Sequence, residues 1–268
     1  MSQMWILLAG ILGLLIGSFV NVVAYRLPAG ISLLRPSQCP HCAAPIRPWQ
    51  NIPVISWLIL RARCASCSTP ISARYPAVEI VTAVMFAALA GYLPLMGLSG
   101  AVAVVAWIAY AWFAASSVVL VLIDLDTRRL PDAVVWPSLG VGLLAFVIAW
   151  PLGADTWALP RALAGMAIMF ACYFLIRFIR PDGMGGGDVK LAAVAGLFLG
   201  WLGWGALAVG WLSGFIAGGV FGIVMMAVGR ANRGSAIAFG PWLLVGTWIG
   251  ILFGNGAAQQ YLAVFGLA

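Results

Sequence analysis

Charged residues are scarce in this chain, and acidic residues are the scarcest of all. Only 8% of its 268 residues are charged, with 14 Lys and Arg against 7 Asp and Glu, whereas about 25% is usual in soluble domains. Hydrophobic residues make up 64% of the chain, and the mean hydropathy is +1.07. This composition excludes an ordinary soluble domain. It predicts an all-α polytopic membrane protein, because helices satisfy their own backbone hydrogen bonds in lipid.

Dense basic runs are missing too. The net charge is +7, but no stretch interleaves closely spaced basic residues with aromatic ones, as a nucleic-acid-binding patch would. We therefore expect no nucleic acid among the partners. The basic residues are better explained as members of loops that set the membrane topology and contact anionic membrane lipid.

Long apolar runs account for most of the sequence. Eight of them approach or exceed the length of about 20 residues that crosses a bilayer. The first has no basic segment ahead of it and no Ala-x-Ala ending, so we expect a retained helix rather than a cleaved signal. The predicted spans are Trp5–Tyr25, Pro76–Met96, Ala101–Ile123, Ala133–Trp150, Pro160–Phe178, Val189–Trp204, Gly205–Val228 and Ala236–Phe253.

Residues 26–75 break this pattern. Prolines recur throughout the segment, which rules out a long helix there. We therefore expect three parts in the chain. They are a first transmembrane helix at 1–25, a small polar domain at 26–75, and a seven-helix transmembrane domain at 76–268.

The polar domain holds two Cys-x-x-Cys pairs separated by 21 residues. Two matched pairs are typical of a structural four-thiolate zinc site. Thiol–disulfide chemistry is the rival interpretation, although a reducing cytosol argues against structural disulfides. We expect zinc, with His41 not a ligand because four thiolates are available, and Cys172 in the fifth span as a buried apolar residue. The predicted ligands are Cys39, Cys42, Cys64 and Cys67.

Basic residues fall almost entirely on one side of the predicted spans. The loops after spans one, three, five and seven, with their borders, hold thirteen of the 14 Lys and Arg, and the remaining one is Arg161. By the positive-inside rule these loops are cytoplasmic. The polar domain and the two acidic stretches described next then face the cytosol.

Residues 182–190 place four glycines and two carboxylates between two apolar runs. Glycine permits unusual backbone conformations and close approach, and a carboxylate at the mouth of an apolar helix is costly unless it is paired or functional. Asp188 is therefore a candidate catalytic group, and Asp124, at the cytosolic end of the third span, is its expected partner. Two carboxylates that share one proton form the aspartic-protease arrangement. The residues alone leave an ion or proton pathway equally open.

Charged neighbours of this pair have simpler explanations. Asp132 follows a proline and precedes a span, where it would cap the helix N-terminus. Asp126 is two positions from Asp124, so on a helix it would point away. Lys190 would either tune the pair or bind lipid phosphate, and we favour lipid.

The chain resembles the type IV prepilin peptidases, membrane aspartyl proteases with a Gly-x-Gly-Asp motif. Gly185-Gly186-Gly187-Asp188 matches that motif, although the family often has a bulkier residue at Gly186. Asp124, followed by Leu130-Pro131, matches the stretch around the second aspartate. Gly-x-Gly-Asp alone is a weak pattern, but its combination with the cysteine quartet and Asn51-Ile52-Pro53 is highly specific. Further matching positions are Ser56, Ile71, Ser72, Arg74, Tyr75, Pro76 and Glu79.

The resemblance implies an enzyme of the bacterial inner membrane with its active side in the cytosol. It implies cleavage of prepilin and pseudopilin leader peptides by Asp124 and Asp188, with Gly185 and Gly187 as motif backbone near the substrate. It also implies that S-adenosylmethionine is then used to N-methylate the new N-terminal residue. No glycine fingerprint locates the methyl donor, and Glu79 is either related to methyl transfer or a partner of Arg74 at the membrane interface. The alternative function is a transporter or channel with intramembrane carboxylates and a structural zinc domain.

Overall fold

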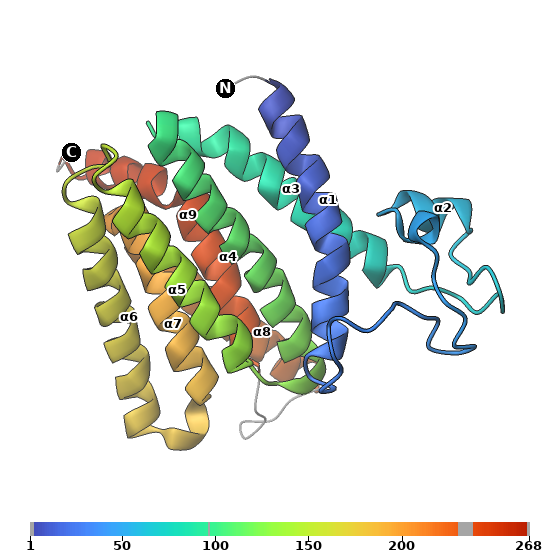
Figure 1. Ribbon diagram of the computed structural model, residues 1–268. Helices are drawn as coiled ribbons and strands as arrows, with labels where there is room; N and C mark the ends of the chain where they lie inside the picture. The colour runs from blue at the N-terminus through green and yellow to red at the C-terminus, as the bar shows by residue number, and fades with distance from the viewer. Residues whose placement is uncertain (1–2, 96, 230–237, 267–268) are drawn as a thin grey trace. The chain divides into compact units, whose positions relative to one another are not determined.

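A computed structural model describes residues 3–95, 97–229 and 238–266 (Figure 1). Over these ranges the regular structure is helical, and extended pairing is limited to two isolated bridges. Seven of the described helices are long and apolar enough to cross a membrane, which confirms the predicted all-α membrane architecture. They are α1 (Gln3–Arg26), α3 (Arg74–Leu95), α4 (Gly100–Thr127), α5 (Asp132–Ala149), α6 (Ala158–Ile179), α8 (Trp204–Ala227) and α9 (Gly240–Val264).

The sixth predicted span, Val189–Trp204, corresponds to α7 (Gly186–Leu202). It has 17 residues, so its length of about 26 Å falls just short of the hydrocarbon core of a bilayer. Every residue from Leu191 to Trp201 is buried, because α7 contacts α5, α6, α8 and α9. Such a helix, apolar all round, belongs in the interior of a bundle.

The described helices form two compact units. The first comprises Met1–Gly97 and Ala111–Ile123, and the second comprises Leu98–Tyr110 and Asp124–Ala268, so α4 contributes to both. In the first unit, α1 packs against α3 through glycine. A Cβ at Gly17 would lie only 2.7 Å from the Cα of Glu79, which is the close backbone approach that small residues allow in lipid.

Within the second unit, α6 and α7 form an antiparallel hairpin joined by η2 (Pro181–Gly183), seen in yellow and orange in Figure 1. Gly165 of α6 and Gly196 of α7 lie backbone to backbone, with no room for a Cβ on either. A Cβ at Gly200 would likewise lie 2.6 Å from the Arg161 carbonyl oxygen. These contacts fix the register of the two helices.

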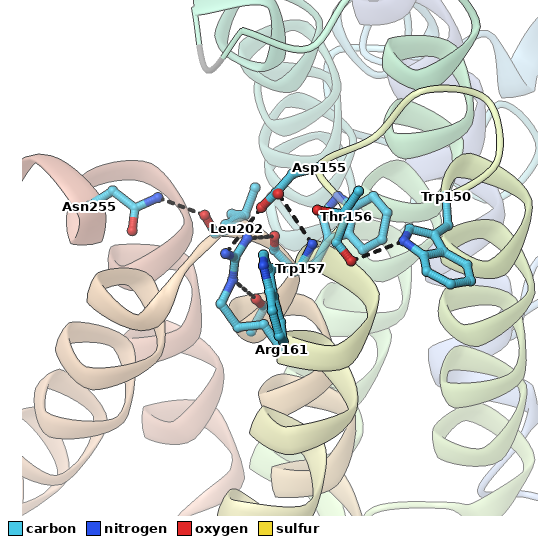
Figure 2. A network of polar contacts seen from close by, with 9 residues as sticks. Trp150, Asp155, Thr156, Trp157, Arg161, Leu202 and Asn255 are labelled. Atoms are coloured by element: carbon cyan, nitrogen blue, oxygen red, sulfur yellow. Dashed lines mark hydrogen bonds and ion pairs between the residues drawn. The ribbon is translucent and has the colours of Figure 1, made fainter.

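Polar side chains hold the C-terminal end of α7 (Figure 2). Arg161 donates to the carbonyl oxygens of Gly200, at 2.8 Å, and Trp201, at 2.9 Å. Asn255 of α9 donates to the carbonyl oxygen of Leu202 at 2.9 Å. The last carbonyls of a helix lack partners within it, so these side chains anchor α7. The arginine predicted to stand apart from the other basic residues therefore has a structural task.

Two helix boundaries differ from the prediction in ways that concern the acidic residues. The helix α7 begins at Gly186 rather than Val189, so Asp188 lies in its first turn. The helix α4 continues to Thr127, which places Asp124 in its last turn. Parts of the prediction involving Met96, Arg230, Arg233 and Ala236 lie outside the described residues.

The predicted N-cap role of Asp132 is wrong. Asp132 is the first residue of α5, and no side-chain cap hydrogen bond forms at this end. Both of its carboxylate oxygens accept hydrogen bonds from Lys190 Nζ at 2.8 Å. Lys190, for which lipid was the favoured partner, thus forms a link between α5 and α7.

Candidate active site and metal centre

Asp124 lies in the last turn of α4 and is only 4% exposed. Its Oδ2 atom has no hydrogen-bond partner among the described residues. The start of α9 approaches it closely, since a Cβ at Gly240 would lie 2.7 Å from this oxygen. A buried carboxylate oxygen without a partner is costly and is characteristic of a site that awaits a proton, water or ligand.

Asp188 lies in the first turn of α7 and is 8% exposed. Its Oδ2 accepts a hydrogen bond from the backbone N–H of Gly185 at 3.2 Å. The positive end of the α7 dipole favours a carboxylate at this position. Gly185 has φ of −66°, so this motif glycine is not needed for an unusual backbone conformation.

Leu130 brings the two aspartates into one site. A Cβ at Gly187 would lie 2.8 Å from the Cβ of Leu130, and a Cβ at Gly240 would lie 3.2 Å from Leu130 Cδ2. One leucine therefore contacts the glycine next to Asp188 and the glycine against Asp124. Asp124 is near enough to Asp188 for its charge to act on that carboxylate.

A residue of α6 that the sequence analysis did not connect with the site also reaches it. Arg177 Nη1 donates to the Met184 carbonyl oxygen at 3.0 Å. The same atom would be 3.2 Å from a Cβ at Gly186, and its charge acts on Asp188. The signal available in the sequence was the position of this arginine at the end of an apolar run next to the glycine motif.

Asp126 differs from Asp124 in its exposure, which agrees with the orientation predicted from its spacing. Its side chain is exposed although it shares the last turn of α4 with Asp124. It therefore offers a matched control for the buried aspartate.

The four cysteines of the polar segment converge on one point. Their Sγ atoms all lie within 4.8 Å of one another, and Cys39 and Cys67 are 3.9 Å apart. Tetrahedral zinc with bonds of about 2.3 Å sets its sulfur ligands about 3.8 Å apart. The cluster therefore fits a zinc ion, which would be held by Cys39, Cys42, Cys64 and Cys67.

The two Cys-x-x-Cys pairs lie in turns of the same backbone conformation. Cys39 N–H donates to the Ala44 carbonyl oxygen at 2.9 Å, and Cys64 N–H donates to that of Thr69 at 2.8 Å. Each turn is closed by a residue with positive φ, Ala43 at 56° and Ser68 at 59°. Two equivalent turns present two equivalent thiol pairs, as a structural four-thiolate site requires.

Local hydrogen bonds prepare two of these thiols for metal. The Thr69 hydroxyl and backbone N–H lower the pKa of Cys67 to about 6. Backbone N–H groups of Cys42 and His41 lower the pKa of Cys39. The thiolate is the form that binds metal. Cys172, which was expected to be buried, is half-buried on α6.

Glu79 holds the loop that carries the Asn-Ile-Pro motif. Its Oε2 accepts a hydrogen bond from the Val54 N–H at 2.7 Å, and the residue is 7% exposed. Val54 has φ of 61°, which is strained for a β-branched residue. Such strain clusters at functional sites. Arg74, the partner predicted for Glu79 as the alternative to a role in methyl transfer, donates to the Leu122 carbonyl oxygen at 3.3 Å.

A cavity of about 580 Å³ opens beside Glu79 in the first unit. Its wall combines α1, the cysteine turns, the Asn-Ile-Pro loop and the start of α3, and this size is typical of ligand sites. Its lining includes Tyr25, Arg35, Trp57 and Glu79.

Comparison with known proteins identifies the family. Residues 111–227, which contain both aspartates, match the sequence model of the type IV leader peptidase family. Residues 11–93, which contain the four cysteines and the cavity, match the bacterial peptidase A24 N-terminal domain.

The chain belongs to the type IV leader peptidase family. Three proteins named "Prepilin leader peptidase/N-methyltransferase" illustrate the similarity of family members to this chain. That of Pseudomonas aeruginosa is 34% identical, with 96% of this chain and 93% of the relative covered. That of Aeromonas hydrophila is 35% identical, with 94% and 92% covered. That of Burkholderia pseudomallei is 36% identical, with 95% and 87% covered. No solved structure matches this member of the type IV leader peptidase family.

Proposed function

We propose that the protein cleaves the leader peptides of type IV prepilins and pseudopilins, with Asp124 and Asp188 as its catalytic carboxylates. The observation that carries this proposal is their convergence. Leu130 lies against a glycine beside each of them, and both are buried. Two like charges held together away from water are costly. Relatives that are 34% identical over most of this chain are named as prepilin leader peptidases. Those names give no support to a transporter or channel.

The pair supplies the chemistry of peptide hydrolysis. Two adjacent carboxylates in a low dielectric share one proton. The ionised carboxylate takes a proton from water as the water oxygen bonds to the scissile carbonyl carbon, and the other carboxyl group gives its proton to the carbonyl oxygen. When the C–N bond breaks, the proton taken from water passes to the leaving nitrogen. The second carboxylate regains its proton from the hydroxyl of the collapsing intermediate.

The proposed setting is the bacterial inner membrane, with the pair facing the cytosol. Arg128 and Arg129 directly follow the last turn of α4, and Arg177 and Arg180 precede the glycine motif. Basic residues at membrane-helix ends mark the cytoplasmic side. The apolar helix of a prepilin would lie in lipid with its leader in the cytosol, so the scissile bond would be at the level of the pair.

The test is cleavage of a prepilin by purified variants in detergent. Asp124→Asn and Asp188→Asn should each lower the rate by about 10³-fold or more, while remaining folded. Asp126→Asn, an exposed aspartate on the same helical turn as Asp124, should cleave at nearly the wild-type rate. Near-normal cleavage by either of the first two variants would refute the proposed pair.

We further propose that the protein N-methylates the new N-terminal residue with S-adenosylmethionine held in the 580 Å³ cavity. Bound S-adenosylmethionine supplies an electrophilic methyl group on a positively charged sulfonium. The Glu79 carboxylate and the rings of Tyr25 and Trp57 suit a cation beside a planar base. The exposed guanidinium of Arg35 suits the carboxylate of the amino-acid part.

A binding measurement tests the cavity separately from the peptidase. Equilibrium dialysis with labelled S-adenosylmethionine should show binding to the wild-type protein and at least about tenfold weaker binding to Arg35→Gln. Arg47→Gln is the matched control, because Arg47 is an exposed arginine in the same segment that does not line the cavity. Equal binding by the two variants would place the donor elsewhere.

The two proposed activities belong to different parts of the chain. We propose that residues 26–75 form the zinc-binding domain that serves methylation, and that helices within 76–268 carry cleavage. Glu79, at the start of the second part, packs through α3 against α1. We therefore assign it to the methyl-donor cavity rather than to the peptidase site.

A further inference from the structure

Two contacts define the register of α6 against α7, one far from the turn that connects the helices and one near it. Gly165 and Gly196 lie backbone to backbone. Nearer the connecting turn, Arg177 Nη1 donates to the Met184 carbonyl oxygen at 3.0 Å. Both pairs keep the same antiparallel offset, so the residues between them can be paired across the hairpin.

Tyr173 lies at the level of Asp188 in this register. Tyr173 is eight residues beyond Gly165 on α6, and Asp188 is eight residues before Gly196 on α7. Because both helices rise equally per residue, equal steps from one contact end at the same height. The charge of Asp188 acts on the Tyr173 hydroxyl, as this proximity requires.

The hydroxyl of Tyr173 is buried without a partner. Tyr173 is 0% exposed, and its hydroxyl has no hydrogen-bond partner among the described residues. An unpaired buried hydroxyl lowers stability, whereas phenylalanine would fill the same space without that loss. A buried hydroxyl that lowers stability in this way indicates that a water or ligand is its hydrogen-bond partner in the functioning protein.

The ring of Tyr173 packs against an aromatic residue that is adjacent in sequence to the glycine beside the second carboxylate. Its centroid lies 5.4 Å from that of Phe215 and 6.0 Å from that of Phe239. Phe239 immediately precedes Gly240, which lies against Asp124 Oδ2. That oxygen also has no hydrogen-bond partner among the described residues. Tyr173 thus stands among groups with unfilled hydrogen-bonding capacity.

We propose that Tyr173 is a catalytic residue of leader cleavage, whose hydroxyl donates a hydrogen bond to the water that Asp188 deprotonates. The inference rests on the proposed aspartate pair. A buried water typically makes about three hydrogen bonds. The water donates one hydrogen bond to each carboxyl group and accepts one from Tyr173 through a lone pair of its oxygen. Its other lone pair is left to attack the scissile carbonyl carbon. As that C–O bond forms, a water O–H bond breaks and its proton passes to Asp188. Tyr173 keeps its own proton throughout.

The test is Tyr173→Phe in the full-length protein, assayed with a prepilin in detergent. This change removes the hydroxyl and keeps the ring that packs against Phe215 and Phe239. We expect kcat to fall about 10²-fold, the usual effect of losing one preorganised donor at a reacting centre. KM should stay within about twofold. The thermal midpoint should stay the same or rise, because an unpaired buried hydroxyl has been removed.

Tyr110 provides the matched control. It is also 0% exposed, but its hydroxyl donates to the Phe198 carbonyl oxygen at 2.6 Å. Tyr110→Phe should lower the thermal midpoint and leave kcat unchanged, which is the reverse of the result expected for Tyr173→Phe.

Three results would overturn the role of Tyr173. These are wild-type kcat in Tyr173→Phe, a loss of kcat accompanied by a lower midpoint, and failure of the variant to fold. The role of the aspartates is judged separately. An inactive Asp188→Asn beside a fully active Tyr173→Phe would reject only the tyrosine, whereas an active Asp188→Asn would reject the pair itself.

Discussion

Gly240 lies so close to Asp124 that a Cβ at position 240 would be 2.7 Å from the carboxylate Oδ2. The same Cβ would meet Leu130 Cδ1 at 3.3 Å. Gly240→Ala should therefore displace the carboxylate and lower prepilin cleavage by at least about tenfold, because small shifts of catalytic groups are costly. The rate of prepilin shortening, followed by mass spectrometry, measures this effect.

Gly219 of α8 serves as the control for that substitution. A Cβ at Gly219 meets nothing within 4 Å. Gly219→Ala should leave cleavage unchanged and stabilise the helix by about 0.5–1 kcal/mol. If both alanine variants cleave equally well, the contact between Gly240 and Asp124 does not constrain catalysis.

The cysteine cluster predicts a bound metal. The purified protein should contain about one zinc per chain, because four thiols within 4.8 Å of one another match a tetrahedral site. Replacing Cys64 with serine should remove the metal, whereas the same change at Cys172, which is not a member of the cluster, should not. Elemental analysis provides the measurement. Disulfides in place of zinc, found by mass spectrometry of the untreated protein, would contradict the metal site.

The Thr69 hydroxyl should strengthen zinc binding most at mildly acidic pH. It is the main cause that lowers the pKa of Cys67 from 9.0 to about 6. Zinc binds the thiolate and competes with protons for it, so a lowered pKa helps binding more as the pH falls from the ordinary value toward the lowered one. Thr69→Val should weaken zinc retention by about tenfold, and more at pH 6 than at pH 8. Zinc release to a coloured chelator at both values tests this, with Thr127→Val as the control outside the cluster.

Cleavage and methylation should separate by mutation. Hydrolysis needs the carboxylate pair and water, whereas methylation needs a donor and an unprotonated amine, whose usual pKa is about 8. Replacing both Cys39 and Cys42 with serine should impair methylation more than cleavage, because loss of zinc loosens only the segment that borders the cavity. Cleavage should proceed without S-adenosylmethionine. Mass spectrometry of the processed N-terminus measures both cleavage and methylation. Full methylation by the double variant would show that methylation does not depend on the cysteine segment.

The proposed topology can be tested with reporter fusions. Fusions after Arg35, Arg129 and Arg233 should report the cytosol, and fusions near Leu98 and Asp155 the periplasm. The expectation follows from the one-sided distribution of basic residues. A cytosolic signal near Leu98 would place the cysteine segment and the aspartates on opposite sides of the membrane.

Much of this architecture was predictable because long apolar runs in a sequence predict membrane helices. The eight expected spans each correspond to a helix. The cysteine spacing predicted a cluster that the structure forms. The pairing of Asp124 with Asp188 follows from the need to explain a carboxylate next to an apolar run, and it stays a prediction.

What could not be predicted depends on contacts between residues far apart in the sequence. Tyr173 looks like any aromatic residue inside an apolar span, and its importance emerges only from the register of α6 against α7. The bond between Lys190 and Asp132 joins positions 58 residues apart. The positive φ of Val54 occurs together with a hydrogen bond from its N–H to Glu79, a residue 25 positions away, and local propensity would not suggest either.

The anchored end of α7 has a pharmacological consequence. Arg161 and Asn255 hold the carbonyls there (Figure 2), about 20 Å along the helix from Asp188. In the proposed topology this end faces the periplasm, where compounds arrive without crossing the inner membrane. We expect Arg161→Ala to lower cleavage by shifting α7 along its axis, and an unchanged rate would dismiss the idea. A compound that competes for these carbonyls would then inhibit a cytosolic reaction from outside the cell, beyond the reach of efflux from the cytosol.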